Sequence, residues 1–174
     1  MKYLVILYIS ILSSYAYAQL HDADTWYFGD YCGISFNTPN NIPIALNNSA
    51  MKTDEGSAVM SDWTGELLFY TDGTTVWNRF HVQMPNGDNL EGHSSSTQSA
   101  IVVQQPRSDH LYYIFTVDRQ GKFFGLKYSI ADMALDETKG DITDKNIPLH
   151  GPVSEKISAV KHKNGKDVWI LAHE

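Results

Sequence analysis

Two apolar runs joined by a polar turn give the clearest pattern in the chain, within residues Thr97–Asp118. The first run, Ser99–Val103, is small and β-branched, and the second, Leu111–Val117, is aromatic and β-branched. The segment between them, Pro106–Asp109, is typical of a turn, because proline fixes φ and Ser and Asp side chains form hydrogen bonds to the backbone. Both runs are apolar almost throughout, which predicts strands covered on both faces. We therefore predict a central β-hairpin.

The order of strand, turn and strand occurs three times along the chain. Each copy opens with Ser-Ala followed by Val or Ile, at Ser57, Ser99 and Ser158. Repeats of roughly 40 to 50 residues with several strands each are typical of propeller blades. A two-stranded unit cannot bury both of its faces alone, so neighbouring units must stack on it. Chance recurrence among β-rich hairpins is the alternative.

Further strand patterns extend the repeated unit. Thr25–Phe28 is strand-like near the start, and Thr75–Trp77 follows the turn after the first copy. Phe124–Ser129 and Ile142–Leu149 follow the second copy, which completes a four-stranded meander, the pattern of one blade. The predicted fold class is all-β, with blades of four-stranded antiparallel meanders. A generic antiparallel sheet or sandwich would use the same strands.

The predicted propeller is incomplete. The chain holds about two and a half such units, whereas a closed propeller needs about four to eight blades. We expect the domain to be truncated at its C-terminal end, or its open edge to be covered by further modules of a longer chain or by self-association. An uncovered apolar edge would invite aggregation.

The first 18 residues predict a secretory signal. Lys2 supplies the positive start, Leu4–Leu12 the apolar centre, and Ala16-Tyr17-Ala18 the small-residue cleavage site, with cleavage between Ala18 and Gln19. An uncleaved membrane anchor is the alternative, although the apolar run is short for a span. The domain then covers residues 19–174, contains no other transmembrane candidate, and is expected outside the cell or on its outer surface.

The charge of the chain argues against one class of partner, and its cysteine content excludes an internal disulfide. The formal net charge is −7, with no basic stripe, which argues against nucleic acid as a partner. The single cysteine, Cys32, cannot form an internal disulfide, and we expect it to be a small buried hydrophobe rather than an exposed thiol.

Candidate chemistry in the sequence is sparse. We identify no catalytic set, no metal-ligand motif and no cofactor fingerprint. Asp72 and Asp118 end equivalent strands, so they could act as paired carboxylates at one rim, and Trp77 could stack on a sugar. The competing interpretations are that aspartates cap turns and that such aromatic residues pack between blades. These three residues are the candidate ligand-binding positions.

A series of different short motifs follows one another along almost the whole mature chain. It comprises Trp26–Gly29, Leu67–Gly73, Val76–Asn78, Met84–Gly87, Ser94–Ala100, Tyr112–Asp118 and Ala159–His162. In combination the series resembles the N-terminal β-propeller region of large secreted proteins that are labelled gliding-motility-associated or type IX sorting-domain proteins. The resemblance implies a secreted or cell-surface propeller followed by further modules and a sorting domain. This sequence lacks that C-terminal part, and no catalytic residues carry over.

The sequence therefore favours a non-enzymatic role. The leading hypothesis is a secreted or cell-surface β-propeller module with a binding or scaffolding role, its ligand a protein or a glycan, as part of a larger adhesin or gliding-motility-associated protein. The alternative is a propeller-type polysaccharide hydrolase or lyase with rim carboxylates. A purely structural spacer is the third hypothesis.

Overall fold

The protein is built from strands that form four separate antiparallel sheets, none of them closed on itself within the described residues. The structure is a computed structural model that describes residues 23–40, 42–121 and 124–174. The strands are β1 (Thr25–Phe28), β2 (Cys32–Ser35), β3 (Ile44–Leu46), β4 (Ala58–Ser61), β5 (Leu67–Thr71), β6 (Val76–Asn78), β7 (Ala100–Gln104), β8 (Leu111–Val117), β9 (Leu126–Asp132), β10 (Asp141–His150), β11 (Ile157–Lys161) and β12 (Val168–Ala172). Two single 3-10 turns, Arg119–Gly121 and Asp136–Thr138, complete the elements.

Each sheet is a meander of strands that follow one another in the sequence. The first sheet is β1-β2-β3, the second β4-β5-β6, the third β7-β8-β9-β10 and the fourth β11-β12. The predicted central hairpin is present as β7 and β8, with a register that runs from Ala100 opposite Thr116 to Gln104 opposite Tyr112. The third sheet thus has the four-stranded meander that the sequence predicted.

Three apolar cores hold the sheets together in chain order. Tyr27 of the first sheet packs with Tyr70 of the second. Phe69, on the opposite face of β5, packs with the core of the third sheet, where Ile114 is fully buried. Beyond the third sheet, Val117 packs with Ile157 of the fourth. The middle sheets are thus covered on both faces, which explains why their strands are apolar almost throughout.

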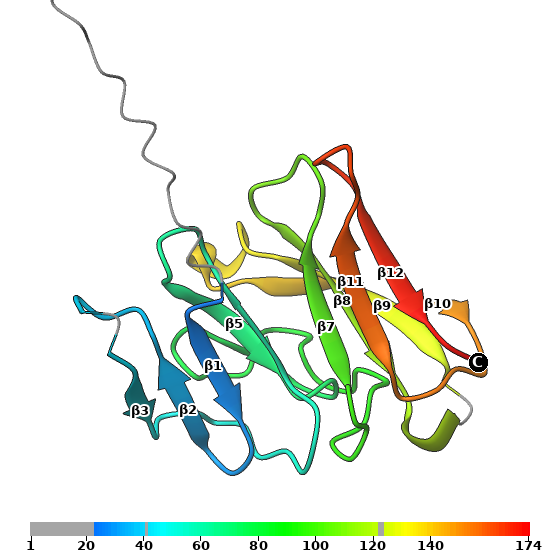
Figure 1. The fold of residues 1–174 in the computed structure, drawn as a ribbon, viewed down its shortest axis with the longest axis horizontal. Coiled ribbons are helices and arrows are strands. Elements are labelled where there is room, and N and C mark those ends of the chain that lie inside the picture. The colour runs from blue at the N-terminus through cyan, green and yellow to red at the C-terminus, as the bar shows by residue number, and fades with distance from the viewer. Residues whose placement is uncertain (1–22, 41, 122–123) are drawn as a thin grey trace, which may run out of the picture.

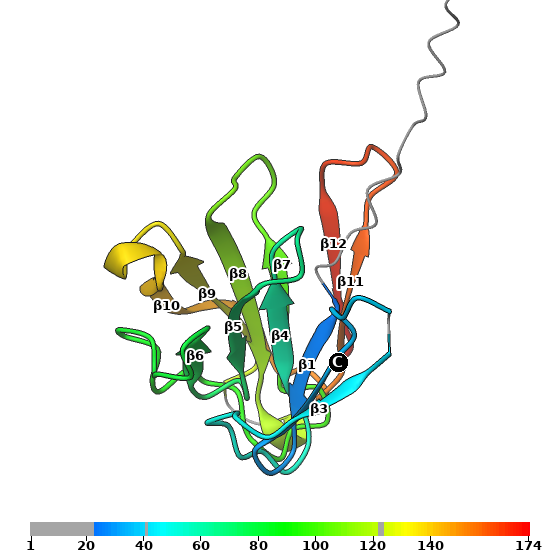
Figure 2. The same ribbon diagram turned by 90° about the vertical axis from the view of Figure 1, so that its left-hand side faces the viewer.

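The first strands of the four sheets lie side by side. β1 contacts β4, β4 contacts β7, and β7 contacts β11. Later strands of the second and third sheets lie further from this line, so that the sheets spread like a fan (Figures 1 and 2). The first and fourth sheets form the two ends of the stack (Figure 1).

The structure corrects two expectations. The sequence predicted about two and a half units, but the described residues form four sheets, because β2 and β3 complete a first sheet that the pattern did not reveal. Cys32 is exposed rather than buried, because it lies on the outer side of that sheet, where its Sγ donates to the carbonyl of Asp30 at 3.1 Å.

The N-terminal predictions lie outside the described residues. The signal segment 1–18, with its cleavage between Ala18 and Gln19, belongs to the part of the chain whose structure is not described. Within the described part, no helix has the length and apolar character needed to cross a membrane.

Candidate functional site

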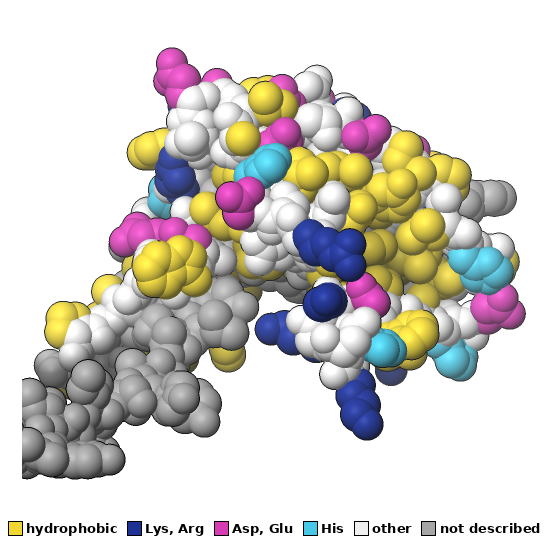
Figure 3. Space-filling view, turned by 90° about the horizontal axis from the view of Figure 1, so that it is seen from above, with side chains coloured by type: hydrophobic (Ala, Val, Ile, Leu, Met, Phe, Trp, Pro, Cys, Tyr) yellow, Lys and Arg dark blue, Asp and Glu magenta, His cyan; other side chains and the backbone are white. Residues whose placement is uncertain are grey.

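Three hairpin turns surround a groove at one end of the first strands. They are the β4–β5 turn (Asp62–Glu66), the β7–β8 turn (Gln105–His110) and the β11–β12 turn (His162–Asp167). The groove has a volume of about 720 Å³, with apolar side chains such as Val102 and Tyr112 among the polar ones of the turns. Figure 3 looks onto this end of the molecule and shows lysine and arginine side chains gathered near its middle.

The outer two turns share one design. In the first, the Gly65 N–H donates to the Asp62 carbonyl at 3.0 Å, and in the third the Gly165 N–H donates to the His162 carbonyl at 2.9 Å. Both glycines have positive φ, 89° and 67°, a conformation that costs glycine little. A type I turn followed by a glycine in this conformation is a common short hairpin connection. Both turns contribute to the lining of the groove, the first through Asp62 and Trp63 and the third through Gly165 and Lys166.

The middle turn is longer and carries an arginine at its tip. The Ser108 N–H donates to the Gln105 carbonyl at 3.1 Å, and the Ser108 hydroxyl accepts from the Leu111 N–H at 3.0 Å. Arg107 adopts a positive φ of 68°. These local bonds fix the turn and hold Arg107 on the wall of the groove.

The carboxylates around the groove are occupied by local partners. Asp62 Oδ1 accepts from the N–H and hydroxyl of Thr64, at 2.8 and 2.6 Å, and from the Glu66 N–H. Burial alone would raise the pKa of Asp62, but these hydrogen bonds together lower it. Asp109 accepts from His110 at 2.8 Å, which raises the pKa of the imidazole. Asp167 accepts from the Asn164 amide at 2.7 Å.

The cations of the groove have no such partners. Arg107, Lys161 and Lys166 line it, and none of them pairs with a carboxylate of the described residues. Trp63, at the tip of the first turn, lines the same groove with 72% of its surface exposed. The groove thus contains both an exposed indole and cations without an ion pair to the described residues, a combination that suits an anionic ligand with a flat apolar face.

The sequence-predicted carboxylates lie at the other end of the strands. Asp72 follows β5, and Asp118 follows β8, so both are remote from the three turns. Asp72 Oδ1 accepts from the Thr74 N–H, the Thr74 hydroxyl and the Thr75 N–H, each at 2.8 Å. Asp118 accepts from the Arg119 N–H at 2.7 Å. Both aspartates are buried, and their observed contacts are those of turn-capping residues.

Trp77 lies between two sheets. Its ring stacks on Tyr70, with centroids 5.5 Å apart and planes inclined by 19°. It packs against the core between the first and second sheets and is only partly exposed. The structure therefore does not bring Trp77 together with Asp72 or Asp118 in one site.

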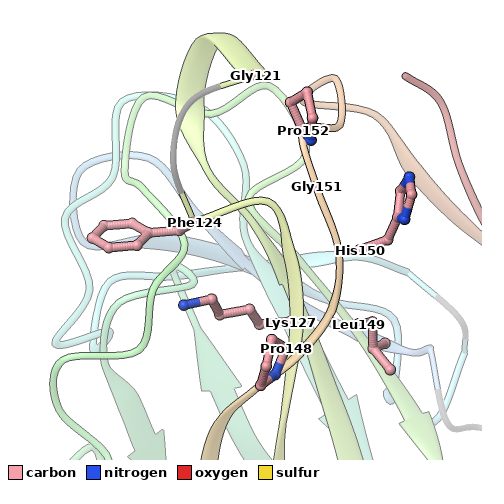
Figure 4. A pocket seen from close by; sticks show the side chains of 8 residues that line it. All are labelled: Gly121, Phe124, Lys127, Pro148, Leu149, His150, Gly151 and Pro152. Atoms are coloured by element: carbon pink, nitrogen blue, oxygen red, sulfur yellow. The ribbon is translucent and has the colours of Figure 1, made fainter.

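A second cavity, of about 710 Å³, lies where β9 and β10 meet the turn after β8 (Figure 4). Its charged groups already have partners. Lys127 pairs with Glu91 and lies 5.0 Å from the centroid of the Phe124 ring. His150 contacts Glu174 at 2.6 Å. This cavity therefore offers less unpaired charge than the groove.

Comparisons with known proteins found no match, so the site is interpreted from its geometry. No family model, no curated protein and no solved structure matches the chain. Within the described residues, no group of three or more His, Cys, Asp or Glu side chains is placed to hold a metal ion.

The groove cations escaped the sequence analysis because they are far apart in the chain. Each lies in a hairpin turn of a repeated unit, or at the strand end beside it. The signal that could have pointed to this region is the recurrence of the three hairpin turns, because the first turn of each unit lies at the same end of its sheet.

Proposed function

We propose that this chain is a secreted, propeller-type module that binds an acidic glycan, non-enzymatically, in the groove between its three hairpin turns. The observation that carries the proposal is that Arg107, Lys161 and Lys166, which have no carboxylate partner among the described residues, line one groove together with the exposed ring of Trp63. The carboxylates of a polyuronate would pair with the cations, and a sugar face would cover the indole.

The propeller assignment is supported by the arrangement of the sheets. Each sheet is a meander, its first strand lies next to the first strands of its neighbours, and each successive pair of sheets shares an apolar core. Radially repeated antiparallel sheets with their first strands innermost are the architecture of propeller blades. The first 18 residues and the family resemblance support export to the outer surface.

The hydrolase alternative gains no support from its candidate residues. Cleavage of a glycosidic bond needs two carboxyl groups that both reach the substrate. Asp72 and Asp118 are buried, and each accepts hydrogen bonds from its own turn. Their geometry supports the turn-capping interpretation.

The proposal is tested by binding measurements with a defined polyanion. Isothermal titration of the chain with polygalacturonate oligomers should show binding that weakens with salt, since exposed charge pairs are screened. Neutral dextran of the same length should not bind. Arg107→Ala and Lys161→Ala should each weaken binding about 2- to 5-fold, the range expected for one exposed ion pair.

The matched control is Lys156→Ala. Lys156 is exposed but precedes β11 at the opposite end of the strands from the groove. It should leave binding unchanged. Equal affinity of wild type and the groove variants, or equal binding of dextran, would contradict the proposal.

A further inference from the structure

The outer face of the fourth sheet is apolar and uncovered. Val160 and Trp169 lie opposite each other in the β11–β12 register, and Leu171 lies two residues beyond Trp169 on the same face. Their exposed fractions are 51%, 60% and 54%. Ile157 and Ile170, on the other face of the sheet, pack against the third sheet.

In the second and third sheets, the pair of residues equivalent to Val160 and Trp169 makes the contact with the following sheet. In the second sheet the pair is Met60 and Phe69, which pack toward the third sheet. In the third sheet the pair is Ile101 and Phe115, which pack toward the fourth. Both phenylalanines lie three residues before the aspartate that ends their strand, Asp72 or Asp118.

Position by position, Val160 and Trp169 therefore correspond to an internal contact between sheets. In this correspondence Ala58, rather than Ser57, is equivalent to Ser99. The first copy of the Ser-Ala repeat is therefore aligned one residue later than its sequence match indicates. Because successive side chains of a strand point to opposite faces, the shift is needed for the two sheets to face the same way.

The first sheet presents the matching surface at the other end of the stack. Tyr27 points into the core, so Trp26 and Phe28 point away from it, with 52% and 44% of their surfaces exposed. Ile34 lies opposite Trp26 and extends the same face. The two ends of the stack are thus both apolar and both rich in aromatic side chains.

The internal contacts of the stack join unlike faces. The second and third sheets each meet the following sheet with the face that carries the pair equivalent to Val160 and Trp169. The fourth sheet exposes this kind of face and the first sheet exposes the opposite kind, which favours contact between unlike ends over contact between like ends.

We propose that the occupant of each end face is a second copy of this chain, with the fourth sheet of one copy packed on the first sheet of the other. Two copies related by a two-fold axis would form two such contacts and close a ring of eight sheets, within the range of four to eight blades. This inference rests on the stacking of the sheets and does not depend on the glycan proposal.

Sedimentation equilibrium of the full chain provides the test. The wild-type protein should have twice the monomer mass that mass spectrometry gives for the same sample. Trp169→Glu and Trp26→Glu should each raise the dissociation constant roughly 30-fold or more, the loss typical of a buried aromatic anchor. Phe80→Glu, an exposed aromatic residue outside both end faces, is the matched control and should remain dimeric.

Mixing the two variants distinguishes unlike-end contact from like-end contact. Each variant alone has a mutated residue in both contacts of the ring, whereas a mixed pair has one contact made of two unaltered faces. The mixture should therefore associate more tightly than either variant. If Trp26→Glu dimerised like wild type while Trp169→Glu did not, the contact would join like ends and the proposal would fail.

Cys32 gives an independent readout that needs no substitution. It lies opposite Phe28 in the first sheet and is exposed in a single copy. Its rate of alkylation by a maleimide should fall as the protein is concentrated into the dimer. A monomer at every concentration, as expected if another protein covers these faces, or a labelling rate that is independent of concentration, would overturn the proposal.

Discussion

Glu155 links the third sheet to the start of the fourth, and its replacement should measure how much that link contributes. Its carboxylate accepts from the Thr97 N–H at 2.8 Å, from the Thr97 hydroxyl at 2.9 Å and from the Gln120 N–H at 2.5 Å. Thr97 precedes β7, and Gln120 lies in the turn after β8. One side chain thus joins three segments.

The expected loss follows from these three bonds. Hydrogen bonds to a charged group contribute about 1.5 to 3 kcal/mol each when buried. Glu155 is close to solvent, so water would replace part of each bond after substitution, and we expect Glu155→Gln to cost about 1 to 2 kcal/mol in total. For a chain of this size that lowers the melting temperature by about 2 to 8 °C.

The pH dependence has a definite sign. The Thr97 N–H, then the Gln120 N–H and the Thr97 hydroxyl, lower the pKa of Glu155. A carboxyl group with a lowered folded pKa stabilises the fold above its unfolded pKa of about 4.3, and this stabilisation is lost as pH falls through the folded pKa. The difference between wild type and Glu155→Gln should therefore be full at pH 6 to 7 and shrink at pH 3.

Thermal unfolding by circular dichroism between pH 3 and 7 measures this difference. Glu137→Gln, a highly exposed carboxylate next to Lys139, is the control and should change stability by less than about 0.5 kcal/mol. A Glu155→Gln protein as stable as wild type at pH 7, or a difference that grows as pH falls, would refute the reasoning.

Three further predictions concern the stability of the fold: a core residue, a partly buried histidine and a turn glycine. Ile114→Ala, at a fully buried position, should cost about 2 to 5 kcal/mol in chemical denaturation, whereas exposed Val82→Ala should cost less than about 0.5 kcal/mol. Burial lowers the pKa of His81, so the fold should lose stability as pH falls below about 6.5, and His81→Asn should flatten the melting temperature between pH 5 and 7; an unchanged slope would contradict this. Gly73→Ala should lower the melting temperature, because φ is 86° and the added Cβ would collide with the Ser99 hydroxyl; a variant as stable as wild type would show that the turn can relax.

The sequence was most informative where strands are long and apolar. β7 and β8 were predicted almost to the residue because both faces of their sheet are covered, and buried strands must be apolar throughout. β2 and β3 were missed because they are short and flank a segment with Pro39 and Pro43, which reads as a loop. β2 pairs with β1 and β3 pairs with β2, and no local sequence pattern encodes these pairings.

The candidate site was harder to predict for a physical reason. Asp72 and Asp118 stood out because they end strands, but a residue at the end of a strand is also where a turn needs a cap, and both accept hydrogen bonds from their turns. Arg107 lies in a turn and Lys161 ends strand β11, more than 50 residues further along the chain, and only the stacking of the sheets brings them to one groove.

The most direct test of the proposed function is to locate the bound glycan by amide hydrogen exchange. Exchange of the chain with and without polygalacturonate would be followed by mass spectrometry of its peptides. The proposal predicts slower exchange in the turns at 62–66, 105–110 and 162–167, and no change in the turns that follow Asp72 and Asp118. Protection confined to the turns after Asp72 and Asp118, or no protection at saturating polygalacturonate, would contradict it.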